Sequence, residues 1–153
     1  MPESAPSVPT FYNSSYRNTV DEKRRVQIPA KWRAGETEEF VLIRWPNGVH
    51  KEACLLALPI TEWMGLVQKL KAMPYSDPKA DSLRRLLGRK SDRVSTDKSG
   101  RVCLPEDMAK ATEIEREAVL VGLVDRFEIW NPKRYEEVTA VDEALSSEAF
   151  KLI

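Results

Sequence analysis

The sequence of 153 residues predicts an α+β fold in which two similar halves complete one barrel-like core. One motif, an Asp followed four residues later by Arg, Val, any residue, an aliphatic residue and Pro, occurs at 21–29 and again at 97–105. Each half then reads as hairpin, helix, strand, strand and helix. Half of such a chain buries too little apolar surface to fold well alone, so the two copies are expected to pack about a pseudo-twofold axis.

The first half begins with a predicted β-hairpin, in which the segments 16–20 and 25–28 flank a charged turn that starts at Asp21. The short predicted helix 29–35 begins with a proline, which is tolerated in the first turn of a helix. A Pro-Asn-Gly turn joins the two predicted strands 39–45 and 53–58. Apolar residues at helical spacing predict a longer helix, and an Asp-Pro pair begins another. The predicted helices are 29–35, 59–73 and 78–88, and the predicted strands are 39–45 and 53–58.

The second half repeats this order, with segments 92–96 and 101–104 around a turn that starts at Asp97. Gly100 allows the positive φ that such turns often need. The remaining elements are helices 105–114 and 132–145 and strands 117–124 and 127–130. We expect a mobile Pro- and Ser-rich tail at 1–11 and a first repeat with its connecting helix at 12–80. A second repeat follows at 81–138, and a C-terminal helix or tail at 139–153.

The composition excludes several classes of protein. Apolar residues make up 42% of the chain, which favours a packed core over disorder. The N-terminus has no basic start followed by an apolar run, and no segment approaches the roughly 18 apolar residues of a membrane span. Cys54 and Cys103 lie in apolar runs, where we expect buried, reduced thiols. These features predict a cytoplasmic protein.

The charge is segregated although the chain carries 24 basic and 24 acidic residues. Segment 17–33 has six basic and two acidic residues, and segment 84–101 has seven basic and two acidic residues. The part from 106 to the end has six basic and twelve acidic residues. Both basic segments contain the repeated motif, and a local basic field on a neutral protein is typical of phosphate-backbone recognition.

The repeated motif has two physical interpretations. An Asp favours the start of a turn because its carboxylate accepts backbone N–H bonds. The Arg that follows can pair with that Asp and only hold the turn, or it can point towards phosphates or guanine edges. A two-stranded ribbon fits the major groove of double-stranded DNA. The residue pattern alone leaves both interpretations open.

Enzyme chemistry finds little support in the sequence. His50 is the single histidine and follows an Asn-Gly turn, so we expect a solvated loop residue. The two cysteines lie far apart without histidine partners, which argues against a metal site. No Gly-rich phosphate loop is present. We therefore predict no catalytic residue, no cofactor, no metal and no small-molecule substrate.

Taken together, the motifs resemble the MraZ family of AbrB-like bacterial transcription regulators. The resemblance rests on the two motif copies, on "CLLALPITEW" and "RRLLGRKSD" between them and on "EAVLVGLVDRFEIW" after the second. It implies a swapped-hairpin, double-ψ barrel of two AbrB-like repeats with flanking helices, and a homo-oligomeric ring. It also implies nucleoid-associated binding to direct repeats in the promoter of the division and cell-wall gene cluster, usually as a repressor.

In the family, the arginine that closes each loop is tied to DNA binding. The resemblance carries this role to Arg25 and Arg101, with Asp21 and Asp97 as loop partners. Residues expected to contact DNA lie on and beside the loops: Arg25, Arg101, Lys23, Arg24, Lys98, Arg17 and Arg93. Arg24 stands where the family usually has the glycine kept as Gly100, so the first turn differs in shape or gains a phosphate contact. The rival interpretation is a ring-forming scaffold that binds proteins and not DNA.

Overall fold

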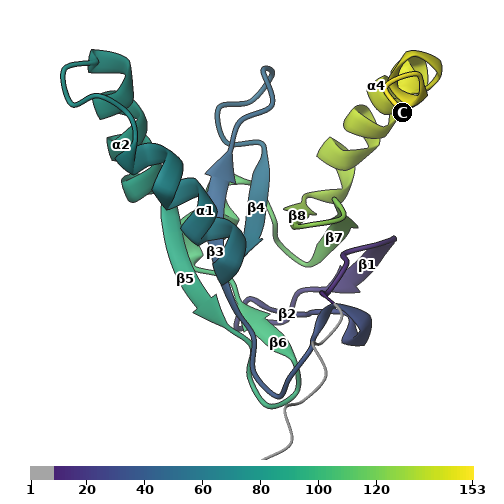
Figure 1. Cartoon of the computed structure of the whole chain (residues 1–153). Helices are drawn as coiled ribbons and strands as arrows, with labels where there is room; N and C mark the ends of the chain where they lie inside the picture. Colours follow the sequence, from purple (N-terminus) through teal and green to yellow (C-terminus); the bar gives the residue numbers. More distant parts are fainter. Residues whose placement is uncertain (1–8) are drawn as a thin grey trace, which may run out of the picture.

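The computed structural model describes residues 9–153 and confirms an α+β fold (Figure 1). Most of the predicted mobile tail, residues 1–11, lies outside the described residues. Six strands form one antiparallel sheet in the order β1-β7-β8-β4-β3-β5. These strands are β1 (Ser15–Thr19), β3 (Glu39–Trp45), β4 (Cys54–Pro59), β5 (Ser91–Ser95), β7 (Glu117–Gly122) and β8 (Phe127–Trp130).

Two further strands, β2 (Arg25–Gln27) and β6 (Arg101–Cys103), pair only with each other and form a short antiparallel ribbon. The predicted hairpins are therefore wrong in their pairing. β1 and β2 share one isolated bridge, Val20 to Val26, and then separate. β1 pairs with β7 and β5 pairs with β3, so the segments beside each turn find their partners elsewhere in the chain. Period-two patterning predicts a strand but does not specify its partner.

The strand order shows how the two halves are related. If β1 is exchanged with β5, β7 with β3 and β8 with β4, the order of the six-stranded sheet reads the same from its other end. β1 and β5, and likewise β2 and β6, start 76 residues apart. The described strands form no closed ladder, because β1 and β5 remain the two edges of the sheet.

One core joins the two halves. Trp32, Phe40 and Phe127 are buried side by side, with ring centroids 5.0 Å apart between Trp32 and Phe127 and 5.1 Å apart between Phe40 and Phe127. The inward residues of the ribbon, Val26 and Val102, pack against this core and are at most 1% exposed. Among the described strands, the pairs β1–β7, β2–β6, β3–β5 and β4–β8 each join the first half of the chain to the second. Neither half therefore encloses its core alone.

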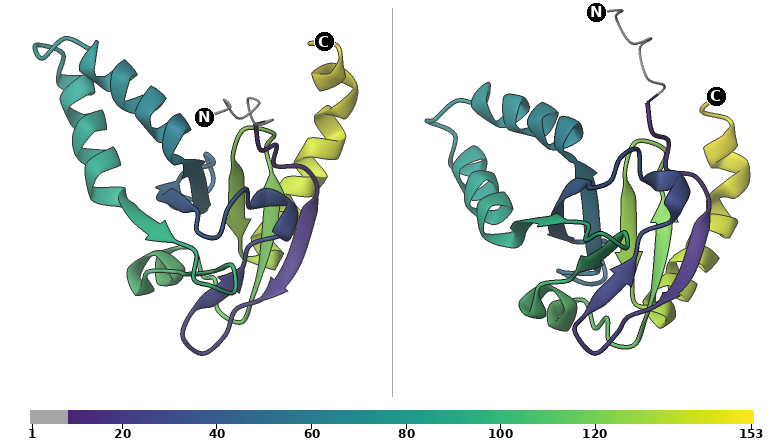
Figure 2. Two further views of the ribbon diagram at one scale, coloured as in Figure 1. Left: turned by 60° about the horizontal axis from the view of Figure 1, so that its bottom comes forward. Right: turned by 90° about the horizontal axis from the view of Figure 1, so that it is seen from below.

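Helices cover the outer face of the sheet and extend beyond it on opposite sides (Figures 1 and 2). α1 and α2 pack on β3 and β4 through Val41, Ile43 and Leu56, and the start of α4 packs on Val119 and Trp130. The last helix runs without a break across the expected boundary at residue 138. The helical elements are the 3-10 helix η1 (Ala30–Trp32) and the α-helices α1 (Ile60–Lys71), α2 (Pro78–Lys90), α3 (Glu106–Ala111) and α4 (Pro132–Phe150).

Two expectations about single side chains need correction. Cys54 is buried as predicted, but Cys103 is exposed. Successive residues of a strand face opposite sides, so Val102 in the core places Cys103 on the outer face of the ribbon. His50, expected in solvent, is half-buried.

Candidate nucleic-acid interface

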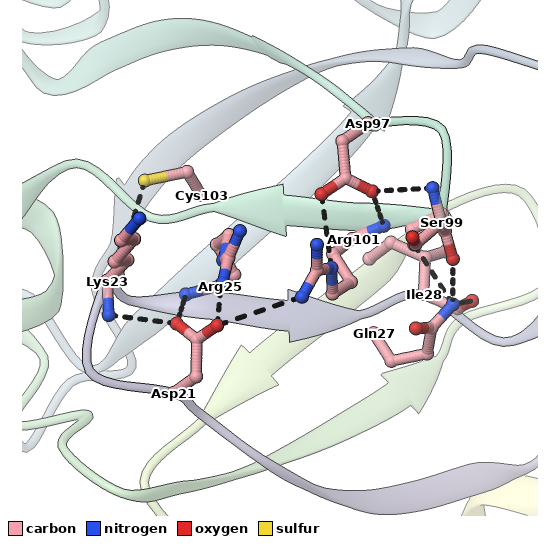
Figure 3. Close-up of polar contacts among 10 residues, drawn as sticks. Asp21, Lys23, Arg25, Gln27, Ile28, Asp97, Ser99, Arg101 and Cys103 are labelled. Carbon is pink, nitrogen blue, oxygen red and sulfur yellow. Dashed lines mark hydrogen bonds and ion pairs between the residues drawn. The ribbon is translucent and has the colours of Figure 1, made fainter.

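The first loop, residues 21–25, is built around one carboxylate (Figure 3). Asp21 Oδ1 accepts hydrogen bonds from the backbone N–H groups of Lys23 at 2.9 Å and Arg25 at 2.8 Å. Its other oxygen, Oδ2, accepts a hydrogen bond from Arg25 Nε at 2.7 Å. The backbone of Arg24 donates to the Asp21 carbonyl at 2.9 Å and closes the turn. The Asp therefore fixes both the backbone and the arginine side chain.

The second loop, residues 97–101, repeats each of these contacts. Asp97 Oδ1 accepts from the N–H groups of Ser99 and Arg101, both at 2.9 Å, and Oδ2 accepts from Arg101 Nε at 3.1 Å. Gly100 donates its N–H to the Asp97 carbonyl at 2.9 Å. The two copies of the motif therefore form the same Asp-centred turn, as their shared spacing predicts.

Backbone hydrogen bonds dominate the electrostatics of both carboxylates. The N–H of Arg25 is the largest cause that lowers the pKa of Asp21 below its usual value, against a smaller opposing effect of burial. The N–H of Arg101 lowers the pKa of Asp97 in the same way. A carboxylate that accepts several N–H bonds is stabilised in its charged form. Both loops are therefore held by ionised aspartates at neutral pH.

The ribbon places the two loops beside each other. Arg25 lies opposite Cys103, and Gln27 lies opposite Arg101, so these four side chains share the outer face while Val26 faces the core. Arg101 Nη1 also lies 3.9 Å from Asp21 Oδ2, which links the two loops. The Gln27 amide donates to the Ser99 carbonyl at 2.8 Å. Two loops that are distant in the sequence thus lie side by side (Figure 3).

Each arginine is held along one edge of its guanidinium. Nε is used by the loop Asp, and about a third of the side chain is exposed, 32% for Arg25 and 33% for Arg101. Among the residues that the structure describes, the terminal nitrogens of Arg25 and Arg101 donate no hydrogen bond. A guanidinium fixed in this way loses less conformational entropy when its free edge meets a phosphate or a guanine. The two interpretations of the motif are therefore compatible.

Arg24 does not change the shape of the first turn. It adopts φ 60°, close to the φ 81° of Gly100 at the equivalent position of the second loop. Its Nε donates to the Leu104 carbonyl at 3.0 Å, at the end of the opposite strand. The expectation of a differently shaped turn is wrong, and the guanidinium is engaged with the second half of the protein.

The same contact occurs at the second loop but comes from another residue. Arg33 Nε donates to the carbonyl of Ile28, the residue equivalent to Leu104, at 3.1 Å. Its guanidinium occupies the space beside Gly100 that a side chain at that position would fill. Each loop therefore has a guanidinium bound to an equivalent carbonyl, delivered by Arg24 in one case and by Arg33 in the other.

The other predicted basic residues divide into two groups. Lys23 and Lys98 are exposed in the turns and lie with the loop arginines. Arg17 on β1 and Arg93 on β5 lie outside the ribbon and are ion-paired, Arg17 with Glu117 at 2.6 Å and Arg93 with Glu39 at 3.0 Å. The structure does not bring these two edge-strand arginines together with the loops.

Sequence reasoning missed three residues of this surface. Gln27 and Cys103 share the outer face with the loop arginines, and strict alternation around the buried Val26 and Val102 would have placed them there. Arg33 lies outside both motif copies and reaches Gly100 only through the fold. No local sequence signal marks that contact.

Comparison with known proteins finds relatives that cover most of this chain. Residues 89–151 match the family model described as "MraZ protein, putative antitoxin-like". A protein named transcriptional regulator MraZ from Herpetosiphon aurantiacus is 37% identical over 88% of this chain and 92% of its own length. Proteins with the same name from Acetivibrio thermocellus and Limosilactobacillus fermentum are 31% and 32% identical, over 91% and 86% of this chain and 92% and 91% of their own lengths. These three relatives are named as transcriptional regulators, and the chain belongs to the MraZ family.

Proposed function

We propose that this protein regulates transcription by binding double-stranded DNA in a sequence-specific manner through the β2–β6 ribbon. One observation carries the proposal: two arginines, Arg25 and Arg101, are locked by equivalent aspartates on the same exposed face. A two-stranded ribbon fits the major groove, where an arginine reads guanine through two hydrogen bonds. The terminal nitrogens of both guanidinium groups donate no hydrogen bond within the described residues, although Arg101 Nη1 lies 3.9 Å from Asp21 Oδ2, and they suit that contact.

The surrounding residues fit different parts of such an interface. Lys23 and Lys98 are exposed in the turns, where they can meet the phosphates that position a protein on DNA. Arg24 and Arg33 have structural partners, so their contribution is to support the loops. Arg17 and Arg93 are already neutralised by glutamates and would contribute least.

The assembly and target remain part of the proposal. Family resemblance supports a swapped-hairpin barrel, a ring of several copies, direct repeats upstream of the division and cell-wall genes, and repression in the cytoplasm at the nucleoid. Several ribbons in one ring would bind repeated sites by avidity. The exposed apolar residues of α4, Val141, Leu145 and Phe150, offer surface for contacts between copies.

The test measures binding of the full chain to DNA from its own upstream region by mobility shift. Arg25→Ala and Arg101→Ala should each weaken binding by about 1–3 kcal/mol per engaged loop, or about 5- to 150-fold. Arg85→Ala, an exposed arginine on α2, is the matched control and should bind as the unchanged protein does. Thermal unfolding of each variant is measured in parallel.

Salt dependence separates DNA recognition from the scaffold interpretation. If about five phosphates are engaged, the logarithm of the binding constant should fall with the logarithm of salt concentration with a slope of about −4 to −5. The exposed apolar side chains of α4 are the observation that favours protein contacts. A ribbon that binds upstream DNA no better than unrelated DNA, with both arginine variants folded and unaffected, would support the scaffold.

A further inference from the structure

A hollow of about 570 Å³ lies beside the β3–β4 turn and is lined mainly by cationic side chains. Its lining comes from the end of β3, the β3–β4 turn, the last turn of α2, the end of α3 and the first turn of α4. β5 begins directly after α2 and leads away to the second loop, residues 97–101, at its other end. Five cations and one carboxylate line the hollow: Arg44, Lys51, Arg89, Lys90, Arg134 and Glu52.

Two largely buried cations of this hollow, Arg44 and Lys90, are only partly neutralised by a carboxylate. Arg44 Nη1 and Lys90 Nζ each lie 3.5 Å from the same oxygen, Oε1 of Glu52. That distance exceeds the roughly 2.7–2.9 Å of a charge-assisted hydrogen bond. Only 17% of the Arg44 side chain and 19% of the Lys90 side chain are exposed. One carboxylate shared by two largely buried cations leaves positive charge that an anion would stabilise.

The hydrogen-bond partners of Arg44 and Arg134 differ. Arg44 Nη2 donates to the Arg89 carbonyl at 3.2 Å, but Arg44 Nε is buried and has no hydrogen-bond partner among the described residues. A buried N–H without a partner is costly. Arg134, by contrast, is satisfied by the carbonyls of Glu52 and Ala53 and by Glu113. The positive charge that Glu52 only partly neutralises is therefore at Arg44 and Lys90.

We propose that this hollow binds a compact polyphosphate, either free or as the phosphate chain of a nucleotide. A single monovalent anion would neutralise one cation. Linked phosphates carry several negative charges and can pair with cations from three elements. The volume lies within the range of small-molecule sites. A DNA duplex fits less well, because more than four-fifths of Arg44 and Lys90 is covered. The C-terminal end of α2 opposes an anion by about half a charge, less than the cations provide.

Isothermal titration of the full chain with sodium tripolyphosphate, at constant ionic strength, tests the proposal. We expect saturable binding at one site per chain, at least tenfold tighter than orthophosphate. Lys90→Gln should weaken it at least tenfold. Lys51→Gln changes an exposed lining residue, so we expect the fold to stay intact and the affinity to fall several-fold. Lys79→Gln, an exposed lysine in the first turn of α2, is the matched control and should not change the affinity.

Titrations with tripolyphosphate and with ATP are compared to identify the source of the phosphates. Equal affinities for tripolyphosphate and ATP indicate that the phosphate chain alone is recognised, and tighter ATP binding indicates a nucleotide. The proposal is overturned if neither compound binds saturably, or if Lys90→Gln and Lys51→Gln both bind as the unchanged protein does. It is also overturned if tripolyphosphate fails to bind and Lys90→Gln changes the oligomer size, because the hollow would then receive another copy of the chain.

Discussion

The two loops of the ribbon have the same geometry but are supported differently. Asp21 and Asp97 accept the same three hydrogen bonds. The guanidinium behind the first loop comes from Arg24 within the turn, whereas the one beside Gly100 comes from Arg33, which lies outside both motif copies. Pseudo-symmetry therefore preserves the position of a charge and not the residue that delivers it.

This difference separates two requirements of a turn. One residue must accept positive φ, and one donor must reach the carbonyl at the end of the neighbouring strand. Gly100 meets the first requirement easily and leaves the second to Arg33. Arg24 meets both, at the cost of holding a non-glycine residue in the left-handed region, about 1–2 kcal/mol.

The largest expected effect comes from separating the halves. We expect residues 1–80 and 81–153, expressed separately, to show no cooperative thermal unfolding. The ribbon and the pairs β1–β7 and β3–β5 all cross this division, so each fragment would expose the strand edges and core that the other covers.

The control is to mix or co-express the two fragments, which should restore one cooperative transition. A fragment that melts cooperatively alone would contradict a shared core. It would also mean that the equivalence of the two loops reflects two independent units.

A second, smaller effect tests the exchange of Arg24 and Arg33. Gly100→Arg copies the first loop onto the second, and alone it should lower the free energy of unfolding by about 1–3 kcal/mol. The reasons are its positive φ and the guanidinium of Arg33, which occupies the space needed by the new side chain. Combined with Arg33→Ala, the same substitution should recover about 1 kcal/mol relative to the sum of the single changes.

Denaturant unfolding of the two single variants and the double variant measures this coupling. Lys31→Ala, an exposed residue near Arg33, serves as the matched second change and should add independently to Gly100→Arg. Additive effects for both pairs would show that the two guanidinium groups do not substitute for each other.

The sequence predicted local structure better than partnership. The Asp-Pro pair predicted the start of α2, and α4 begins at residue 132 as predicted. The side chains of Asp77 and Asn131 cap those two helices. Pairing of β1 with β7 could not be predicted, since alternation says which face is apolar and not which strand lies beside it. The two motif copies revealed Arg25 and Arg101. The contact between Arg33 and Ile28 depends on the fold alone.

The aspartates give both loops a related pH dependence. Their pKa values are lowered in the folded protein, chiefly by the N–H groups of Arg25 and Arg101. A lowered folded pKa stabilises the protein above the ordinary value of about 3.9 and loses that contribution as pH falls through the lowered value. We expect Asp21→Asn and Asp97→Asn to lower Tm at pH 7 and to reduce the fall of Tm in acid.

Thermal unfolding from pH 7 to about pH 2, which extends well below the ordinary aspartate pKa of about 3.9, measures both effects. Asp21→Asn should cost slightly more than Asp97→Asn, because Asp21 also faces Arg101 across the ribbon. Asp142→Asn, on the exposed part of α4, provides the control and should leave the profile unchanged. An Asp21→Asn profile that falls in acid as steeply as that of the unchanged protein would rule out this source of pH dependence.

The smallest expected effect concerns Arg24 itself. Arg24→Gly removes the hydrogen bond to Leu104 but also the strain of φ 60°, so the free energy of unfolding should change by less than about 0.5 kcal/mol. Arg24→Ala loses the bond and keeps the strain, and should cost about 1 kcal/mol more. If Arg24 only supports the loop, DNA binding by the folded Arg24→Gly variant keeps its salt slope. A slope shallower by about 1 would show instead that Arg24 contacts a phosphate.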